Sequence, residues 1–124
     1  MLIRDSATGP HEQVMDHSVL FELLHPDKVA GAKDLTCSIA HAIVPAGTAT
    51  LPHRLHTSTE LYYILKGTGT MQIDGETAPV HPGQIVLIPP GAVQHIQNTG
   101  PGDLTFLCIV SPKWQRSDES LVPE

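Results

Sequence analysis

Short apolar runs, each stopped by Gly, Pro or Asp, recur along the chain and constrain its fold more than any other feature. The chain has 124 residues, among them 11 Pro and 10 Gly. Neither residue continues a helix well, and both favour turns. Helix formers are not grouped into long amphipathic stretches. The pattern therefore predicts an all-β protein built from many short strands.

The expected strands follow one another at regular intervals. We expect them at residues 19–24, 37–44, 48–55, 60–65, 70–74, 77–80, 85–88, 93–98 and 104–110. Asp74-Gly75 predicts a two-residue hairpin turn between two of them. This strand number and turn spacing are typical of a jelly roll or a sandwich, and the length fits one domain with one core.

The two ends of the chain differ in character from its middle. Residues 1–18 are polar and predict an irregular N-terminal arm, and residues 113–124 predict a polar C-terminal tail with Trp114 as its large anchor. The barrel is expected at residues 19–112. Several runs inside it are apolar at consecutive positions, at 61–65, 85–88 and 106–110. Both faces of these strands then need cover, which predicts a homodimer.

Charge and composition exclude some partners. The net charge is −6, from 13 acidic against 7 basic residues, so a nucleic-acid partner is not expected. The longest apolar run is too short to cross a membrane. Residues 1–10 lack the apolar core of a secretory signal, so we expect a cytoplasmic protein in which Cys37 and Cys108 are reduced.

Two stretches carry a pattern of His, Glu, Gly and Pro at fixed spacing. The first runs from Gly47 through His53 and Glu60 to Gly67. The second runs from Gly83 through the Pro-Pro-Gly of residues 89–91 to Asn98. Together they resemble the two motifs of the cupin family, in order and with the turn residues in place. The resemblance implies a cupin double-stranded β-helix, that is, a jelly-roll barrel in a single domain of the small cupin 2 type.

The resemblance also implies a metal site in the barrel lumen. The family pattern supplies two His and a Glu from the first motif and a His from the second. This sequence departs from it at two of the four positions: Leu55 stands at the second His position and Gln94 at the third. Mixed His and carboxylate sites suit divalent Fe, Mn, Ni, Zn or Cu, and the expected ligands are His53, Glu60 and Gln94.

A one-residue slip in either motif leaves other assignments open. Because side chains alternate along a strand, His56 reaches the lumen only if the strand bulges, and so does His95. His56 is therefore kept as a further candidate ligand. Tyr62 is two residues after Glu60 and faces the same way, as a candidate proton donor or substrate clamp.

The family resemblance leaves the function between two classes. One is a small metal-dependent enzyme, with dioxygenase-like or lyase and isomerase chemistry, that acts on a small polar metabolite in the lumen. The other is a barrel that binds a small molecule, or acts as a sensor, without catalysis. Two ligand positions at which the family has His are occupied here by Leu55 and Gln94, and this favours the second class. The fold alone does not choose between them.

Overall fold

The strands lie where the turn residues predict them, with two further strands at the chain ends. A computed structural model describes residues 1–123. Within this range the chain forms strands and short 3-10 segments but no α-helix. The strands are β1 (Glu12–Gln13), β2 (Val19–Leu24), β3 (Ser38–Val44), β4 (His53–Leu55), β5 (Thr59–Lys66), β6 (Gly69–Ile73), β7 (Glu76–Val80), β8 (Ile85–Ile88), β9 (Gln94–Asn98), β10 (Leu104–Ser111) and β11 (Glu119–Leu121), with η1 (Pro26–Lys28) and η2 (Arg116–Asp118) between them.

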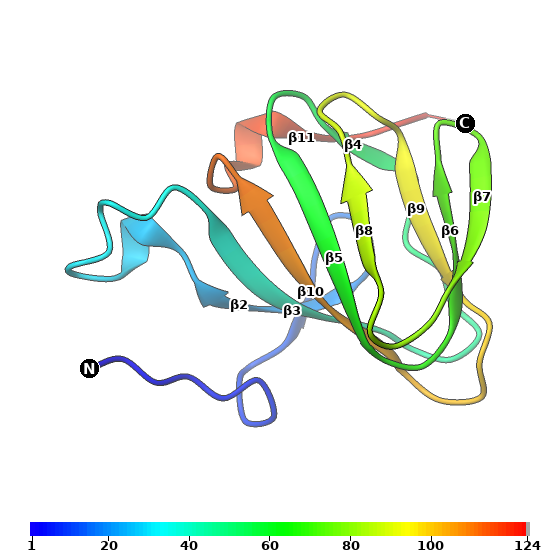
Figure 1. The fold of residues 1–124 in the computed structure, drawn as a ribbon, viewed down its shortest axis with the longest axis horizontal. Coiled ribbons are helices and arrows are strands. Elements are labelled where there is room, and N and C mark those ends of the chain that lie inside the picture. Colours follow the sequence, from blue (N-terminus) through cyan, green and yellow to red (C-terminus); the bar gives the residue numbers. More distant parts are fainter. Residues whose placement is uncertain (124) are drawn as a thin grey trace.

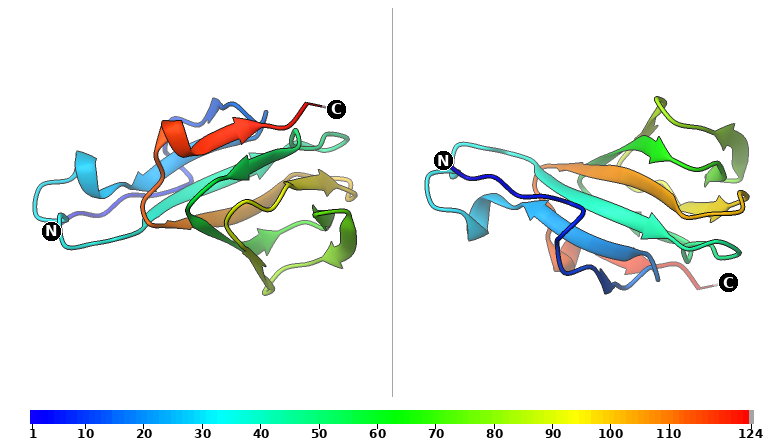
Figure 2. Two further views of the ribbon diagram at one scale, coloured as in Figure 1. Left: turned by 90° about the horizontal axis from the view of Figure 1, so that it is seen from above. Right: turned by 90° about the horizontal axis from the view of Figure 1, so that it is seen from below.

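The strands form two antiparallel sheets that pack face to face (Figure 1, Figure 2). The six-stranded sheet has the order β1-β2-β3-β10-β5-β8, and the five-stranded sheet has the order β11-β4-β9-β6-β7. The all-β jelly-roll prediction is confirmed. Among residues 1–123, no helix is long and apolar enough to span a membrane.

The core lies between the sheets because successive strand residues point to opposite faces. On β10, Leu104, Phe106 and Cys108 are buried, and on β5, Tyr62 and Ile64 are buried. Phe106 packs against the Tyr62 ring with 4.3 Å between the centroids. Their neighbours in sequence face outward. The inner faces of these two strands thus form the wall on which the candidate site is built.

Three local features can be compared with the expected strands: one strand is shorter, one hairpin forms as expected, and two edge strands are additional. The strand expected at 48–55 shortens to β4, because Pro52 has no N–H to give to a ladder. The hairpin at Asp74-Gly75 forms as predicted, with φ of 49° and 83°, the positive values that a two-residue turn of this kind requires. β1 and β11 were not expected, since pairing at a sheet edge uses backbone groups and needs no apolar pattern.

Gly67, the last residue of the first motif, lies where a side chain would clash with the neighbouring backbone. Its φ is +86°, and a Cβ there would lie 2.6 Å from the Asp103 carbonyl oxygen. We expect Gly67→Ala to lower the free energy of unfolding by about 1–3 kcal/mol, measured by chemical denaturation. Gly102→Ala is the control, because nothing lies within 4 Å of a Cβ at Gly102. Equal stability of the two variants would contradict this account.

Candidate functional site

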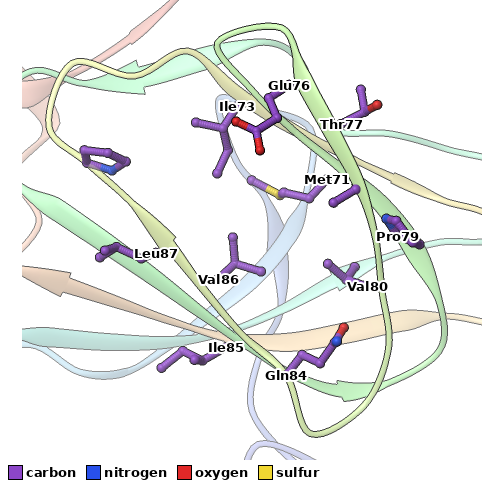
Figure 3. Close-up of a pocket in the computed structure, with 12 residues that line it drawn as sticks. Met71, Ile73, Glu76, Thr77, Pro79, Val80, Gln84, Ile85, Val86 and Leu87 are labelled. Atoms are coloured by element: carbon purple, nitrogen blue, oxygen red, sulfur yellow. The ribbon is translucent and has the colours of Figure 1, made fainter.

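A cavity of about 900 Å³, partly open to solvent, lies against the inner face of the six-stranded sheet and carries most of the buried ionisable groups. Its wall combines the inner faces of β3, β5 and β10 with β4, the N-terminal arm and the C-terminal tail. The ionisable side chains in its wall that lie near His53 and Glu60 are those two residues themselves with Asp16, Tyr62, Cys108 and Glu119. A second cavity, of about 600 Å³, lies between β7 and β8 and is largely apolar (Figure 3).

Three strands bring the expected site residues together. His53 opens β4 and is buried, as is Leu55 two positions later on the same face. Gln94 opens β9 and pairs directly with His53 across the sheet. Glu60 and Tyr62 point inward from β5 in the opposite sheet.

Gln94 connects two of these side chains through both ends of its amide. The Tyr62 hydroxyl donates to Gln94 Oε1 at 2.8 Å, and Gln94 Nε2 donates to Glu60 Oε1 at 2.8 Å. The exposed fraction of Gln94 is 0%. The amide is thus held between the two sheets in a single orientation. Burial raises the pKa of Tyr62 well above its ordinary value, so Tyr62 stays neutral and its proton is directed to Gln94.

Glu60 is a neutral carboxylic acid at neutral pH. Burial raises its pKa to about 8, the neighbouring Glu119 and Asp16 carboxylates act in the same direction, and the hydrogen bond from Gln94 opposes them. Only Oε1 has a hydrogen-bond partner within residues 1–123. No fully buried side-chain polar atom in that range lacks a partner, so Oε2 faces the cavity. Glu60 therefore presents a transferable proton to the lumen.

His53 is held in one tautomer. Its Nδ1 is 2.6 Å from the Leu51 carbonyl oxygen, and since a carbonyl only accepts, Nδ1 carries the proton. In the neutral ring, Nε2 therefore bears the lone pair. It lies 3.4 Å from Oδ2 of Asp16. An imidazolium formed at His53 would lie directly beside this carboxylate.

Asp16 enters the site from the N-terminal arm and is held there by its own turn. Oδ1 accepts from the Ser18 backbone N–H at 2.9 Å and from the Ser18 hydroxyl at 2.6 Å. The Leu51 N–H donates to the Asp16 backbone carbonyl at 2.7 Å. The Leu51 residue thus holds both Asp16 and His53, one through its N–H and one through its C=O.

Glu119 enters the site from the C-terminal tail. It starts β11, where it pairs with Leu55 of β4. The Trp114 indole donates to Glu119 Oε1 at 2.8 Å. Burial and the Asp16 carboxylate raise the pKa of Glu119, while the Trp114 hydrogen bond and His53 oppose the rise. Trp114 also donates its backbone N–H to Ser38 Oγ, so it holds the tail on the barrel as expected.

Sequence reasoning missed Asp16 and Glu119 because nothing local marks them. Asp16 precedes Ser18 by two residues, which is a turn signal and not a site signal. Glu119 belongs to a polar tail without a motif. Only the pairing of β11 with β4 and the contact of the arm with Leu51 bring these carboxyl groups to His53.

Two other histidines of the motif region lie away from the lumen. His56 is exposed on the loop after β4, where its Nε2 lies 2.8 Å from Ser120 Oγ. His95 follows Gln94 and points to the opposite face of the sheet, with Nε2 2.9 Å from Gln72 Oε1 of β6. Neither strand bulges in the way that would turn these rings inward.

Comparison with known proteins gives the family. The sequence model of the cupin domain family matches residues 40–110. The chain belongs to the cupin family.

Relatives of this cupin carry different names. An uncharacterized protein of Methanocaldococcus jannaschii is 41% identical over 107 residues, which are 86% of this chain and 83% of that protein. An oxalate-binding protein of Thermotoga maritima is 33% identical over 67 residues, which are 54% of this chain and 55% of that protein.

Solved structures place the fold among cupin barrels. The crystal structure of a predicted oxalate decarboxylase from Thermotoga maritima matches with a TM-score of 0.78 and 25% identity, covering 90% of this cupin and 99% of that chain. Pac13 from Streptomyces, a nucleoside dehydratase, matches with a TM-score of 0.73 over 98% of this cupin and 91% of that chain. At 14% identity, the likeness to Pac13 shows the fold alone.

The residues of this cupin do not form the metal site that the family pattern implies. Within residues 1–123, no group of three or more His, Cys, Asp or Glu side chains is arranged to hold a metal ion. Gln94 uses both amide atoms within the protein, Leu55 takes one expected position, and His56 lies outside. The side chains at the expected ligand positions therefore do not fit a bound transition metal. The proposed chemistry does not depend on one.

Proposed function

We propose that this cupin is an acid–base enzyme of the lyase or isomerase class that acts on a small polar metabolite in the lumen. One observation carries the proposal: His53 and Glu60 line the same cavity, and each has one side-chain atom held by the protein and the other directed away from that contact. In its neutral form His53 offers the Nε2 lone pair, and Glu60 retains its proton up to a pKa of about 8. Pairs of titratable groups with such separated roles are typical of acid–base sites.

The proposed chemistry is a paired proton transfer. His53 Nε2 removes a proton from a substrate carbon, and the electron pair of that C–H bond forms a new double bond. Glu60 Oε2 delivers its proton either to a leaving hydroxyl, which departs as water, or to another substrate atom, which gives an isomer. Asp16 lies beside the imidazolium that results, and opposite charges at this distance attract each other.

Tyr62 in the cavity wall and the fully buried Gln94 orient the Glu60 carboxyl. Gln94 and Tyr62 hold the Glu60 carboxyl so that Oε2 faces the cavity. Tyr62 is therefore a positioning residue in this proposal, and a proton donor to substrate only if a ligand displaces Gln94. The divalent transition metal suggested by the family pattern, and the dioxygenase chemistry that it would support, remain predictions for elemental analysis.

A second candidate function is a small-molecule-binding barrel without turnover. The saturated hydrogen bonds of Gln94 and the buried, apolar Leu55 at an expected ligand position favour it. The 33% identical relative from Thermotoga maritima, named for oxalate binding, supports the same class. Oxalate is therefore one of the first ligands to test.

The experiment follows untagged protein by proton NMR in D₂O with uridine, oxalate and a panel of small hydroxy acids and sugars. We expect product formation or deuterium incorporation that EDTA does not abolish. His53→Gln should lower the rate at least about 100-fold. His56→Gln, the matched control outside the cavity, should leave the rate unchanged.

Two results would overturn this function. Binding without turnover, little changed by His53→Gln, would leave the binding barrel. Near-stoichiometric transition metal in elemental analysis, lost together with turnover in His53→Gln, would establish the metal-dependent enzyme instead.

A further inference from the structure

The two ends of the chain place carboxyl groups at the same end of the cavity that holds His53. Asp16 comes from the N-terminal arm and Glu119 from the C-terminal tail, and both line this cavity. Figure 2 shows the arm and the tail on the same side of the six-stranded sheet. Asp16 and Glu119 each raise the pKa of Glu60, and Asp16 also raises the pKa of Glu119. Since a charge shifts a pKa only at short range, the three carboxyl groups lie close together.

The partners of Asp16 and Glu119 carry no fixed positive charge. Asp16 accepts from Ser18 and lies 3.4 Å from His53, which is charged only when protonated. Glu119 accepts from the neutral Trp114 indole. Among residues 1–123, neither carboxyl group forms an ion pair with Lys or Arg. This end of the cavity therefore has an excess of negative charge, which attracts a cation.

The basic side chains of the cavity wall are engaged elsewhere or exposed. Lys28 pairs with Glu22 at 2.7 Å, and Arg4 donates to a backbone carbonyl of β2 at 2.8 Å. Arg116 is exposed, and it is not one of the groups that lower the pKa of Glu119. The wall as a whole thus contains both signs of charge, whereas the end near His53 is negative.

The same end of the cavity presents polar atoms that lack a donor from the protein. In the neutral ring, His53 Nε2 is an acceptor, so it and Asp16 Oδ2 are two acceptors 3.4 Å apart. Glu119 accepts through Oε1, and no group in residues 1–123 donates to its Oε2. Glu60, with an exposed fraction of 8%, also directs Oε2 into the cavity. Three acceptor atoms beside a buried acid therefore suit a ligand group that carries several hydrogens.

Aromatic rings line the cavity next to these atoms. Tyr62 and Phe106 lie in its wall with ring centroids 4.3 Å apart. Trp114 lies beside Glu119, because its indole N–H donates to that carboxyl group at 2.8 Å. The face of an aromatic ring is electron-rich and attracts organic cations. Charge and aromatic lining therefore favour the same kind of ligand.

We propose that the ligand of this cavity carries a primary ammonium group, held by Asp16 and Glu119 beside His53. An ammonium group has a positive charge and three N–H donors, which match the three acceptors. A hydroxyl offers a single donor, and a carboxylate or phosphate is repelled by both acidic residues. The cavity volume of about 900 Å³ leaves room for the body of a small molecule. Turnover of such an amine rests on the proposed acid–base function, whereas its binding does not.

The test is a ligand-observed NMR titration of the untagged chain with two pairs of probes, serine with glycerate and glucosamine with glucose. Each pair differs by an ammonium group in place of a hydroxyl, and we expect the amine to bind at least about 10-fold more tightly. Asp16→Asn and Glu119→Gln keep the oxygens that accept from Ser18 and Trp114. Each should weaken binding of the two amines roughly 10-fold or more. Glu76→Gln removes an exposed carboxyl group at the other cavity and is the matched control, with unchanged affinity.

Circular dichroism checks that each variant keeps its β-sheet signal, and proton NMR of the same samples follows turnover separately from binding. Failure of serine and glucosamine to bind, or equal or tighter binding of glycerate and glucose, would overturn the ammonium ligand. Full amine affinity in both Asp16→Asn and Glu119→Gln would do the same, and an equal loss in Glu76→Gln would assign the effect to net charge.

The two proposals fail in different ways. Turnover of glycerate or glucose without binding of the amines would overturn the ammonium ligand and leave the acid–base function standing. Selective binding of the amines without turnover, lost in Asp16→Asn and Glu119→Gln, would support the ammonium ligand and count against the acid–base function.

Discussion

Replacing Glu60 by Gln is expected to raise the free energy of unfolding, by an amount that grows with pH to the order of 5 kcal/mol near pH 8. Gln has the shape of a neutral Glu and keeps an oxygen that accepts from Gln94. It removes the need to bury a negative charge. The effect follows from the pKa of Glu60, which burial raises from 4.5 to about 8.

The sign of the pH dependence follows from proton binding. Above pH 4.5 the unfolded chain loses the Glu60 proton, whereas the folded chain keeps it up to about pH 8. The folded state then binds more protons, so this group's contribution to stability is fully present below pH 4.5. It is lost at about 1.4 kcal/mol per pH unit as the pH rises toward 8. Above that window the difference between Glu60→Gln and the wild type becomes constant.

Chemical denaturation of wild type and Glu60→Gln at pH 5, 6, 7 and 8 measures this difference. Glu76→Gln, which removes a carboxyl exposed on β7, controls for the change in net charge. Equal stabilisation by both variants would assign the effect to net charge. A difference between Glu60→Gln and wild type that stays flat over pH 5–8 would show that Glu60 is ionised in the folded protein.

Replacing Gln94 by Leu is expected to lower the free energy of unfolding by about 2–6 kcal/mol. Leu fills a similar volume but leaves the Tyr62 hydroxyl and the Glu60 carboxyl without their partner inside the protein. Each unpaired buried polar group costs about 1–3 kcal/mol. Because the Gln94 hydrogen bond lowers the pKa of Glu60, its loss also raises that pKa further.

Gln97→Leu is the control for this substitution, since Gln97 is on the same strand with its side chain exposed. It should change stability by no more than about 0.5 kcal/mol. Comparable stability of Gln94→Leu and Gln97→Leu would show that the Tyr62–Gln94–Glu60 hydrogen bonds do not form as described. A loss confined to Gln94→Leu would support Gln94 as the group that orients Glu60.

The sequence by itself determined the strands and the direction of most lumen residues. Both depend on local rules: Gly and Pro end the runs, and alternation sends His53 and Leu55 to one face of β4 and Tyr62 inward from β5. The spacing of the two motifs was enough to predict the family, because turn residues and inward residues keep fixed offsets along a strand. The same alternation predicted that other side chains, such as His95, point to the opposite face of their strand and away from the lumen.

Only the tertiary structure decided what surrounds these residues. Asp16 and Glu119 reach His53 from the two ends of the chain, through backbone pairing that leaves no pattern in the sequence. The partners of Gln94 lie on another sheet, and the pKa of Glu60 depends on how completely the barrel buries it. Local periodicity sets where a side chain points, whereas the charge and proton state of a buried group depend on neighbours that are distant in the chain.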